Sequence, residues 1–239
     1  MAHDERWIEP RSHGLDLDHI ALAVPAMDLG IAHVAELTGA EPVVLPAEAG
    51  QWYRSGSLPL GPDTALEILA PSPEYGRFHP LGTLLTGLRE PQLLFWYLAT
   101  ADLAALERRL GEESVPLHRV EHVDSGGDGP AAYRRAQIGK RFVSAMPQAI
   151  EWIRRTDRHG TDDRCTLTGF DLRHPDAAEH NRVLAAIGST VRMRSGEHRL
   201  SITIDCPAGE VTIASPGIDG TPLRMIQGIA RGLIASRRR

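Results

Sequence analysis

Three side chains that can hold a proton or a metal ion stand inside stretches that otherwise look like buried strands. His19 lies in LDHIALAV, Glu67 in ALEILA and Glu151 in AIEWI. A buried carboxylate without a partner is costly, so it usually becomes neutral, finds a partner or binds a metal ion. One imidazole and two carboxylates suit a divalent first-row metal and leave positions open for water or substrate. The sequence therefore predicts a metal site; the alternative is a hydrogen-bonded core or edge histidine and two glutamates on solvated faces of a sheet.

Strand alternation predicts that these three side chains converge, because successive side chains of a strand point to opposite faces. In the first stretch the larger apolar side chains share the face that His19 does not occupy, and Glu67 is separated from its apolar neighbours in the same way. Glu151 lies opposite to Ile150 and Trp152. We expect helices to cover the apolar faces, so that the three polar side chains point into a common chamber.

Further residues are candidates for contact with a substrate in that chamber. They are Tyr53, Arg54, Trp96, His118 and His122. Arg54 could hold a carboxylate or a phosphate, although an ordinary surface arginine fits the sequence equally well. His118 and His122 stand four residues apart on a strand-like run and share a face. One of them could supply a further ligand or carry a proton; the alternative is a pair of exposed or hydrogen-bonded strand residues.

The elements that must position these side chains recur with a period near 75 residues. Each copy begins with an apolar strand-like run and a short turn. An amphipathic helix follows and ends at Gly39, Gly111 or Gly188, as glycine commonly ends a helix. Three β-prone runs separated by Gly, Pro and Asp complete each copy. The pattern predicts three units of the order strand, helix, strand, strand, strand.

We therefore expect an α+β protein of repeated βαβββ units. The first unit with its linker covers 15–90, where a short helix is expected near the end, and the second covers 91–156. These two pair to form a concave half-barrel chamber. A third unit over 165–216 attaches to the outside or caps an edge. An apolar helix with a basic tail over 221–239 is expected to dock on the body or on a second subunit of a homodimer.

Composition limits the classes of partner and compartment. The chain has 239 residues, of which 42% are hydrophobic, and a formal net charge of −5. This balance argues against a nucleic-acid partner. No apolar run approaches membrane-spanning length and the N-terminal residues contain no signal-peptide core, so no membrane is expected. Two cysteines, Cys165 and Cys206, form no disulfide framework, which favours the reducing cytoplasm.

The motifs LDHIALAV, LEILAPSP and IEW, in this order on repeated units, resemble the vicinal oxygen chelate superfamily, which includes glyoxalase I, extradiol dioxygenases and bleomycin- and fosfomycin-resistance proteins. FDLRHPD before the last predicted helix resembles the glyoxalase-like branch. The resemblance implies a divalent metal (Fe, Mn, Ni, Co or Zn) held by His19, Glu67 and Glu151. Metal-dependent members have a histidine at a fourth place, where LLFWYLAT brings Leu93 or Leu94 nearest.

The resemblance implies a metal-dependent lyase or isomerase acting on a small oxygenated substrate. Two adjacent substrate oxygens would chelate the metal, which would stabilise an enolate-type anion. Glu67 or Glu151 would leave the metal and act as the general base. Two alternatives remain open. One is a metal-free protein that binds a small drug-like molecule, favoured by the missing fourth ligand. The other is an extradiol-type dioxygenase, which needs a further histidine such as His118 or His122.

Overall fold

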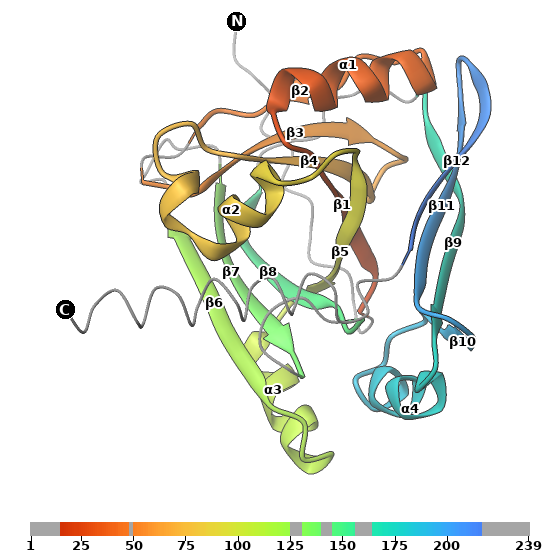
Figure 1. Cartoon of the computed structure of the whole chain (residues 1–239). Coiled ribbons are helices and arrows are strands. Elements are labelled where there is room, and N and C mark those ends of the chain that lie inside the picture. Colours follow the sequence, from red (N-terminus) through yellow and green to blue (C-terminus); the bar gives the residue numbers. More distant parts are fainter. Residues whose placement is uncertain (1–14, 48–49, 125–130, 140–144, 156–163, 217–239) are drawn as a thin grey trace, which may run out of the picture.

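A computed structural model gives the structure of the chain (Figure 1). It describes residues 15–47, 50–124, 131–139, 145–155 and 164–216. Within these residues the elements are four α helices and two β sheets, one of eight strands and one of four. The predicted α+β class with repeated βαβββ order is confirmed. The helix and tail predicted over 221–239 lie outside the described residues.

The eight-stranded sheet is built from two units of the same order. The first consists of β1 (Leu17–Ala23), α1 (Met27–Thr38), β2 (Val43–Val44), β3 (Tyr53–Pro59) and β4 (Ala65–Pro71). The second consists of β5 (Gln92–Thr100), α3 (Leu103–Glu112), β6 (Leu117–Asp124), β7 (Ala131–Ile138) and β8 (Gln148–Arg155). The strand order is β2-β3-β4-β1-β5-β8-β7-β6. In each unit the first strand therefore pairs with the last, and the two first strands meet in the middle of the sheet.

Side-chain alternation gives the sheet two different cores. On β1, Ile20 and Leu22 belong to the larger core on the helix-bearing side, whereas Ala21 and Ala23 belong to a second core on the inner side. The first helix packs very closely on this sheet. A Cβ atom added at Gly30 would lie only 2.7 Å from the Ile68 side chain, so the close approach of α1 depends on glycine there.

The linker between the units carries a 3₁₀ turn, η1 (Gly76–Phe78), and the predicted short helix, α2 (Pro80–Thr86). Figure 1 shows α2 on the inner side of the curled sheet, with α1 and α3 on its outer side. Leu84 and Leu85 of α2 belong to the inner core, together with Phe95 of β5. The linker helix therefore fills part of the space that the paired units enclose, and it narrows the chamber.

The register of β1 and β5 shows how the two units correspond. The strands are antiparallel, with His19 opposite Tyr97 and Ala21 opposite Phe95. The register stays the same when β1 and β5 are exchanged. An approximate two-fold axis through the centre of the sheet requires this. Phe95 is therefore the counterpart of His19 in the second unit, and Tyr97 is the counterpart of Ala21.

The third unit has the predicted element order but a different strand order. It consists of β9 (Thr166–His174), α4 (Ala177–Ala186), β10 (Met193–Ser195), β11 (Arg199–Cys206) and β12 (Gly209–Pro216), arranged as β10-β9-β11-β12. Its first strand pairs with β10 and β11 instead of with its last strand. In the paired units the first strand also pairs with the first strand of the other unit. β9 has no such neighbour, and the backbone hydrogen bonds on both of its edges are made within its own sheet.

The third unit packs on the outer side of the eight-stranded sheet through the larger core, which the two sheets share. Trp96 of β5 contacts Phe170 of β9 edge to face, with ring centres 5.6 Å apart. The backbone N–H of Leu93 donates to Ser215 Oγ at 2.6 Å. Cys165 and Cys206 are both buried, and neither forms a disulfide. Of the helices described, none combines the length and the apolar character needed to cross a membrane.

Candidate active site

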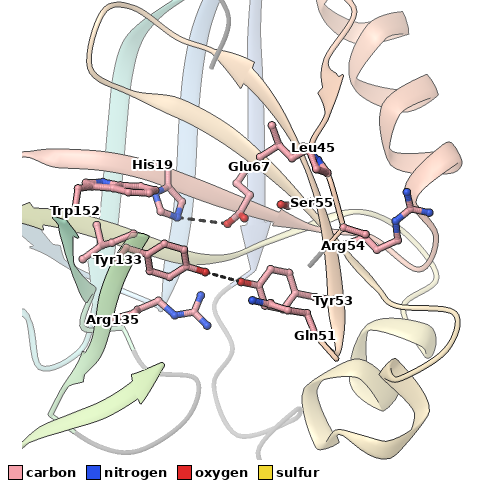
Figure 2. A pocket seen from close by; sticks show the side chains of 13 residues that line it. His19, Leu45, Gln51, Tyr53, Arg54, Ser55, Glu67, Tyr133, Arg135 and Trp152 are labelled. Carbon is pink, nitrogen blue, oxygen red and sulfur yellow. Dashed lines mark hydrogen bonds and ion pairs between the residues drawn. The ribbon is translucent and has the colours of Figure 1, made fainter. Parts of the chain in front are cut away.

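The inner face of the paired units forms a pocket to which both units contribute side chains (Figure 2). The first unit provides His19, Leu45, Pro46, Ala47, Gln51, Tyr53, Arg54, Ser55 and Glu67, and the second provides Tyr133, Arg135, Ile150 and Trp152. Polar, charged and aromatic groups therefore meet in one place, although they are far apart in the sequence.

His19 and Glu67 meet as predicted on the inner side of the sheet. His19 Nε2 lies 3.4 Å from Glu67 Oε2, and Figure 2 shows the two side chains facing each other. The imidazole is buried, with 9% of its side chain exposed, and it stacks on Tyr97 with ring centres 3.8 Å apart. Glu67 has 17% of its side chain exposed. The carboxylate thus stands between the imidazole and the open part of the pocket.

Asp18 is the residue at this site that sequence reasoning missed. Its Oδ2 lies 2.7 Å from His19 Nδ1, and its Oδ1 accepts a hydrogen bond from Trp152 Nε1 at 3.0 Å. Alternation predicts that Asp18 points away from His19. A β-bulge changes this, because Leu17 pairs with Leu98 and His19 with Tyr97, which leaves Asp18 as an extra residue. Bulges re-aim side chains in this way.

The two carboxylates control the charge of His19. Burial lowers the pKa of His19, but the hydrogen bonds and negative charges of Asp18 and Glu67 outweigh it, so the pKa stands above the ordinary value of 6.5. The two carboxylates therefore favour the doubly protonated form of the ring, in which each nitrogen would donate to one carboxylate. Sequence reasoning alone placed one of these two carboxylates beside His19.

The opposite wall of the pocket carries hydroxyl groups and a buried cation. The hydroxyl groups of Tyr53 and Tyr133 are hydrogen-bonded at 3.1 Å. Arg135 is only 9% exposed, and its Nη1 donates to the Tyr97 hydroxyl at 3.3 Å. Burial together with the positive charge of Arg135 lowers the pKa of His79 below its ordinary value. The second unit therefore contributes a positive charge where the first contributes negative ones.

Glu151 does not join His19 and Glu67, so the predicted convergence of these three side chains is wrong. Glu151 Oε2 accepts from Arg134 Nη1 at 3.3 Å, on the face of β8 opposite to the pocket. The neighbouring residues Ile150 and Trp152 line the pocket instead. The alternation was read correctly, but the assignment of the two faces was reversed, because the apolar pair on this strand covers the chamber and not the helix side.

Trp96 is also on the other side of the sheet. It belongs to the outer core, and its Nε1 donates to the carbonyl oxygen of Ala145 at 2.9 Å. Tyr53 and Arg54 both line the pocket as predicted. Figure 2 shows the Arg54 guanidinium directed away from the His19–Glu67 pair, whereas Arg135 points inward. Arg54 therefore lies at the rim of the pocket.

The two histidines of β6 lie on the edge strand of the sheet. His118 pairs with Gln137 and His122 with Arg134. His118 is half-buried and does not belong to the described lining of the pocket. The side chain of His122 lies outside the described residues. His118 therefore does not lie next to His19 and Glu67, as a second histidine ligand would have to.

The correspondence of the two units identifies the counterparts of the predicted ligands. Ala21 lies opposite Glu67, and its counterpart Tyr97 lies opposite Gln148. Gln148 is therefore the counterpart of Glu67. It is buried, and its Oε1 has no hydrogen-bond partner among the described residues. The place equivalent to His19 is Phe95. The sequence had suggested Leu93 or Leu94 for this place, which are two residues and one residue before Phe95.

The donor set does not fit a metal centre with four protein ligands, nor one with three ligands drawn from His, Cys, Asp and Glu. His19 Nε2 and Glu67 Oε2 are 3.4 Å apart, close to the spacing of two ligands about 2.1 Å from one tetrahedral ion. The other two equivalent places hold Phe95, which has no donor atom, and the neutral amide of Gln148. Among the described residues, no group of three His, Cys, Asp or Glu side chains could hold a metal ion. These residues therefore support no reaction step through a metal.

Comparison with known proteins identifies the family. The model of the glyoxalase-like domain matches residues 17–188. The chain belongs to the glyoxalase-like domain family. This family assignment confirms the resemblance to the vicinal oxygen chelate superfamily, whose members commonly use a divalent metal. A comparison with curated protein sequences found no match.

Solved structures with the same arrangement include a hypothetical protein from Staphylococcus aureus. It is 11% identical, covers 85% of this chain and 86% of its own, and has a TM-score of 0.54, which supports the fold alone. Methylmalonyl-CoA epimerase from Mycobacterium tuberculosis is 20% identical over 63% of this chain and 94% of its own, with a TM-score of 0.43. The Streptomyces coelicolor epimerase is 17% identical over 59% and 100%, with a TM-score of 0.45.

Proposed function

We propose that this glyoxalase-like protein is an enzyme of the lyase or isomerase type that moves a proton on a small oxygenated substrate, with Glu67 as the base. The observation that carries the proposal is the position of the Glu67 carboxylate. It lies between a buried imidazole and the open part of the pocket, 3.4 Å from His19 Nε2. A general base needs this combination of a fixed orientation and access to substrate.

The proton transfer uses groups that the chain itself provides. A C–H bond next to a substrate carbonyl breaks, its proton passes to a Glu67 oxygen, and the electron pair moves to the carbonyl oxygen as an enolate. The protonated imidazole of His19, whose two N–H groups face Asp18 and Glu67, supplies a nearby positive charge that stabilises the enolate electrostatically. Return of the proton to another carbon, or protonation of the same carbon on its opposite face, gives an isomerase, and loss of a leaving group gives a lyase.

Asp18 acts through His19 and not on the substrate. It accepts a hydrogen bond from His19 at 2.7 Å and one from Trp152 at 3.0 Å. These two bonds hold the imidazole ring and its charge in place, as carboxylate–histidine pairs do in other sites. Glu151 has no part in this mechanism, since its carboxylate pairs with Arg134 on the other face.

A hydrogen-exchange experiment tests the proposal. Protein treated with a chelator is incubated in D₂O with pyruvate and a panel of small 2-oxo and 2-hydroxy acids, and deuterium uptake at carbon is followed by NMR. We expect uptake for at least one compound, its loss in Glu67→Gln and its retention in Glu151→Gln. Uptake that persists in Glu67→Gln, or that appears only after a divalent metal is restored, would contradict the metal-free proton transfer.

A second candidate function is a metal-free binding protein for a small molecule. It is favoured by the aromatic part of the lining, which includes Tyr53, Tyr133 and Trp152. Aromatic side chains bind organic ligands well without reacting with them. Tight ligand binding with no deuterium uptake from any compound would favour this function over the first. The dioxygenase alternative is less well supported, because His118 lies outside the pocket lining described here.

A further inference from the structure

Arg135 is a buried cation on the inner wall of the pocket that the proposed proton transfer does not use. Its side chain lines the pocket although the residue is only 9% exposed. The guanidinium carbon lies 5.9 Å from the ring centre of Tyr53 and 5.8 Å from that of Tyr97. These aromatic faces and the Tyr97 hydroxyl, which accepts from Nη1 at 3.3 Å, hold the guanidinium in one orientation.

Two consecutive arginines of β7 have different surroundings. Arg134 has half of its side chain exposed and pairs with Glu151 on the outer face. Arg135 points into the pocket, where Tyr53, Tyr133 and Gln51 lie around it (Figure 2). Burying a guanidinium in a largely aromatic wall is costly. Such a cost is usual where the fork of N–H donors receives a planar carboxylate.

The charges of the pocket are divided between its two walls. Asp18 and Glu67 surround His19 on the first unit, and Arg135 stands on the second. A substrate placed between the walls would meet a base at one end and a fixed cation at the other. The hydroxyl groups of Tyr53 and Tyr133, 3.1 Å apart, lie beside the cation and add donors for oxygen atoms.

We infer that Arg135 binds a carboxylate group of the substrate, so that the substrate is a small carboxylic acid whose reacting C–H faces Glu67. This inference rests on the proposed function, because it names the substrate class of the same pocket. The carboxylate would receive N–H donors from Arg135 and an O–H donor from the tyrosine pair. Arg54 at the rim, which the sequence suggested for this role, is not required.

The test compares two probes of the same shape, pyruvate and its uncharged amide, pyruvamide. Their affinities are measured by NMR titration in the Glu67→Gln background, where turnover does not interfere. We expect the protein to prefer pyruvate by roughly tenfold or more, as for a hydrogen bond to a charged group. Arg135→Met should abolish the preference, Arg135→Lys should keep part of it, and Arg134→Met, the matched control, should keep all of it.

Several results would overturn the inference. Equal affinity for the two probes before any change at Arg135 would do so even if Arg135→Met failed to fold. An unchanged preference in a folded Arg135→Met variant, or inorganic phosphate binding more tightly than pyruvate, would also do so. The two proposals separate cleanly. Deuterium uptake without a preference that depends on Arg135 would support Glu67 as the base and contradict the carboxylate site. A preference that depends on Arg135 without deuterium uptake would support the carboxylate site and contradict the proton transfer.

Discussion

The two halves of the chamber share a backbone design but differ in the chemistry of their inner faces. In the first unit, Ser57 lies opposite Glu67 on the neighbouring strand; in the second, Gln137 lies opposite Gln148. Ser55 lies two residues before Ser57 on β3, and Arg135 lies two residues before Gln137 on β7, so Ser55 corresponds to Arg135. The first half thus provides a titratable acid, and the second provides amides and a fixed cation.

Where the two halves agree, the shared residues build the chamber itself. Tyr53 and Tyr133 are counterparts, and their hydroxyl groups meet across the space between the units. On the outer face of the sheet, the strands of both halves contribute apolar residues to the outer core. The apolar packing is therefore similar in the two halves, whereas the polar residues of the inner face differ. The reason is that an apolar residue of the core packs against many neighbours, while a polar residue of the inner face contacts few.

The difference between the halves indicates which kind of molecule the pocket can bind. A symmetric pair of acids and histidines would surround a cation on the two-fold axis. Here the acidic groups are gathered around His19, and Arg135 lies on the other wall. A chamber of opposite charges is suited to a substrate with two unlike ends.

The largest expected effect comes from replacing the acid of the first half by the amide found at the equivalent position of the second half. Glu67→Gln makes the first half resemble the second, and we expect the rate of deuterium exchange to fall by about 10²–10⁴-fold. Glu151→Gln, the matched change on the outer face, should leave the rate nearly unchanged. The rates are compared at saturating substrate. Equal losses in both variants would show that the assignment of the two faces is incorrect.

A second change makes the second half resemble a metal-binding first half. In Phe95→His/Gln148→Glu the four equivalent places all carry donors, and we expect tight binding of Ni²⁺ or Zn²⁺. At a free metal concentration a thousand times Kd the stabilisation is about 4 kcal/mol.

This gain is measured by denaturant unfolding with and without metal. The two single variants serve as controls, and neither should gain as much. Without metal the double variant should be less stable than the parent, because it buries an additional carboxylate. Absence of any metal-dependent stabilisation would count against the two-fold correspondence of Glu67 and Gln148.

The acidic half should also make stability depend on pH. Since the folded-state pKa of His19 is raised above 6.5, its contribution is fully present below the unfolded-state value of about 6.5 and is lost as pH rises through the folded-state value. Asp18→Asn removes one of the causes of the raised pKa. We expect it to lower the free energy of unfolding by about 1.5–3 kcal/mol below pH 6.5 or so, and by less at higher pH.

This dependence is measured by unfolding in denaturant from about pH 5 to about pH 9, with NMR titration of the His19 ring as the direct readout. In Asp18→Asn the ring should titrate at lower pH than in the parent. A loss of stability that is the same at every pH would indicate that Asp18 stabilises the strand by packing and not through the charge of His19.

The smallest effect concerns the contact that joins the two halves. Tyr53→Phe and Tyr133→Phe each remove one hydroxyl of the pair at 3.1 Å. A double-mutant cycle should give a coupling energy of about 0.5–1.5 kcal/mol in the free energy of unfolding. Tyr75→Phe, at an exposed tyrosine of the linker, is the control. Strictly additive effects would mean that the hydroxyl groups contribute separately.

Much of the architecture could be predicted from the sequence. The period near 75 residues, two of the three glycines expected to end helices and the alternating apolar runs depend on local patterns, and they correspond to the observed helices and strands. Gly39, for example, adopts the left-handed conformation at the end of α1, with φ of 68°, where glycine is favoured. The prediction for Gly111 is wrong, because this residue lies inside α3, which continues to Glu112. His19 and Glu67 could be assigned to one face because large apolar side chains alternate with them.

Other features depended on how the strands pair. Glu151 and Trp96 were assigned to the wrong face, because alternation separates two faces of a strand without saying which one a helix covers. Asp18 was missed because a bulge at a single residue reversed its direction. Arg135 was missed because two consecutive arginines look alike until the register of β7 places one inside and the other outside.

The repeated units, the class of fold and the inward direction of His19 and Glu67 could be predicted from the sequence alone, since each depends on the pattern of residues within short segments. The tertiary structure alone decided which wall each charge occupies, that Asp18 shares His19 with Glu67, and that the counterparts on the second unit are Phe95 and Gln148. The physical reason is that strand register and the two-fold relation of the units arise from contacts between residues far apart along the chain, which local periodicity does not encode.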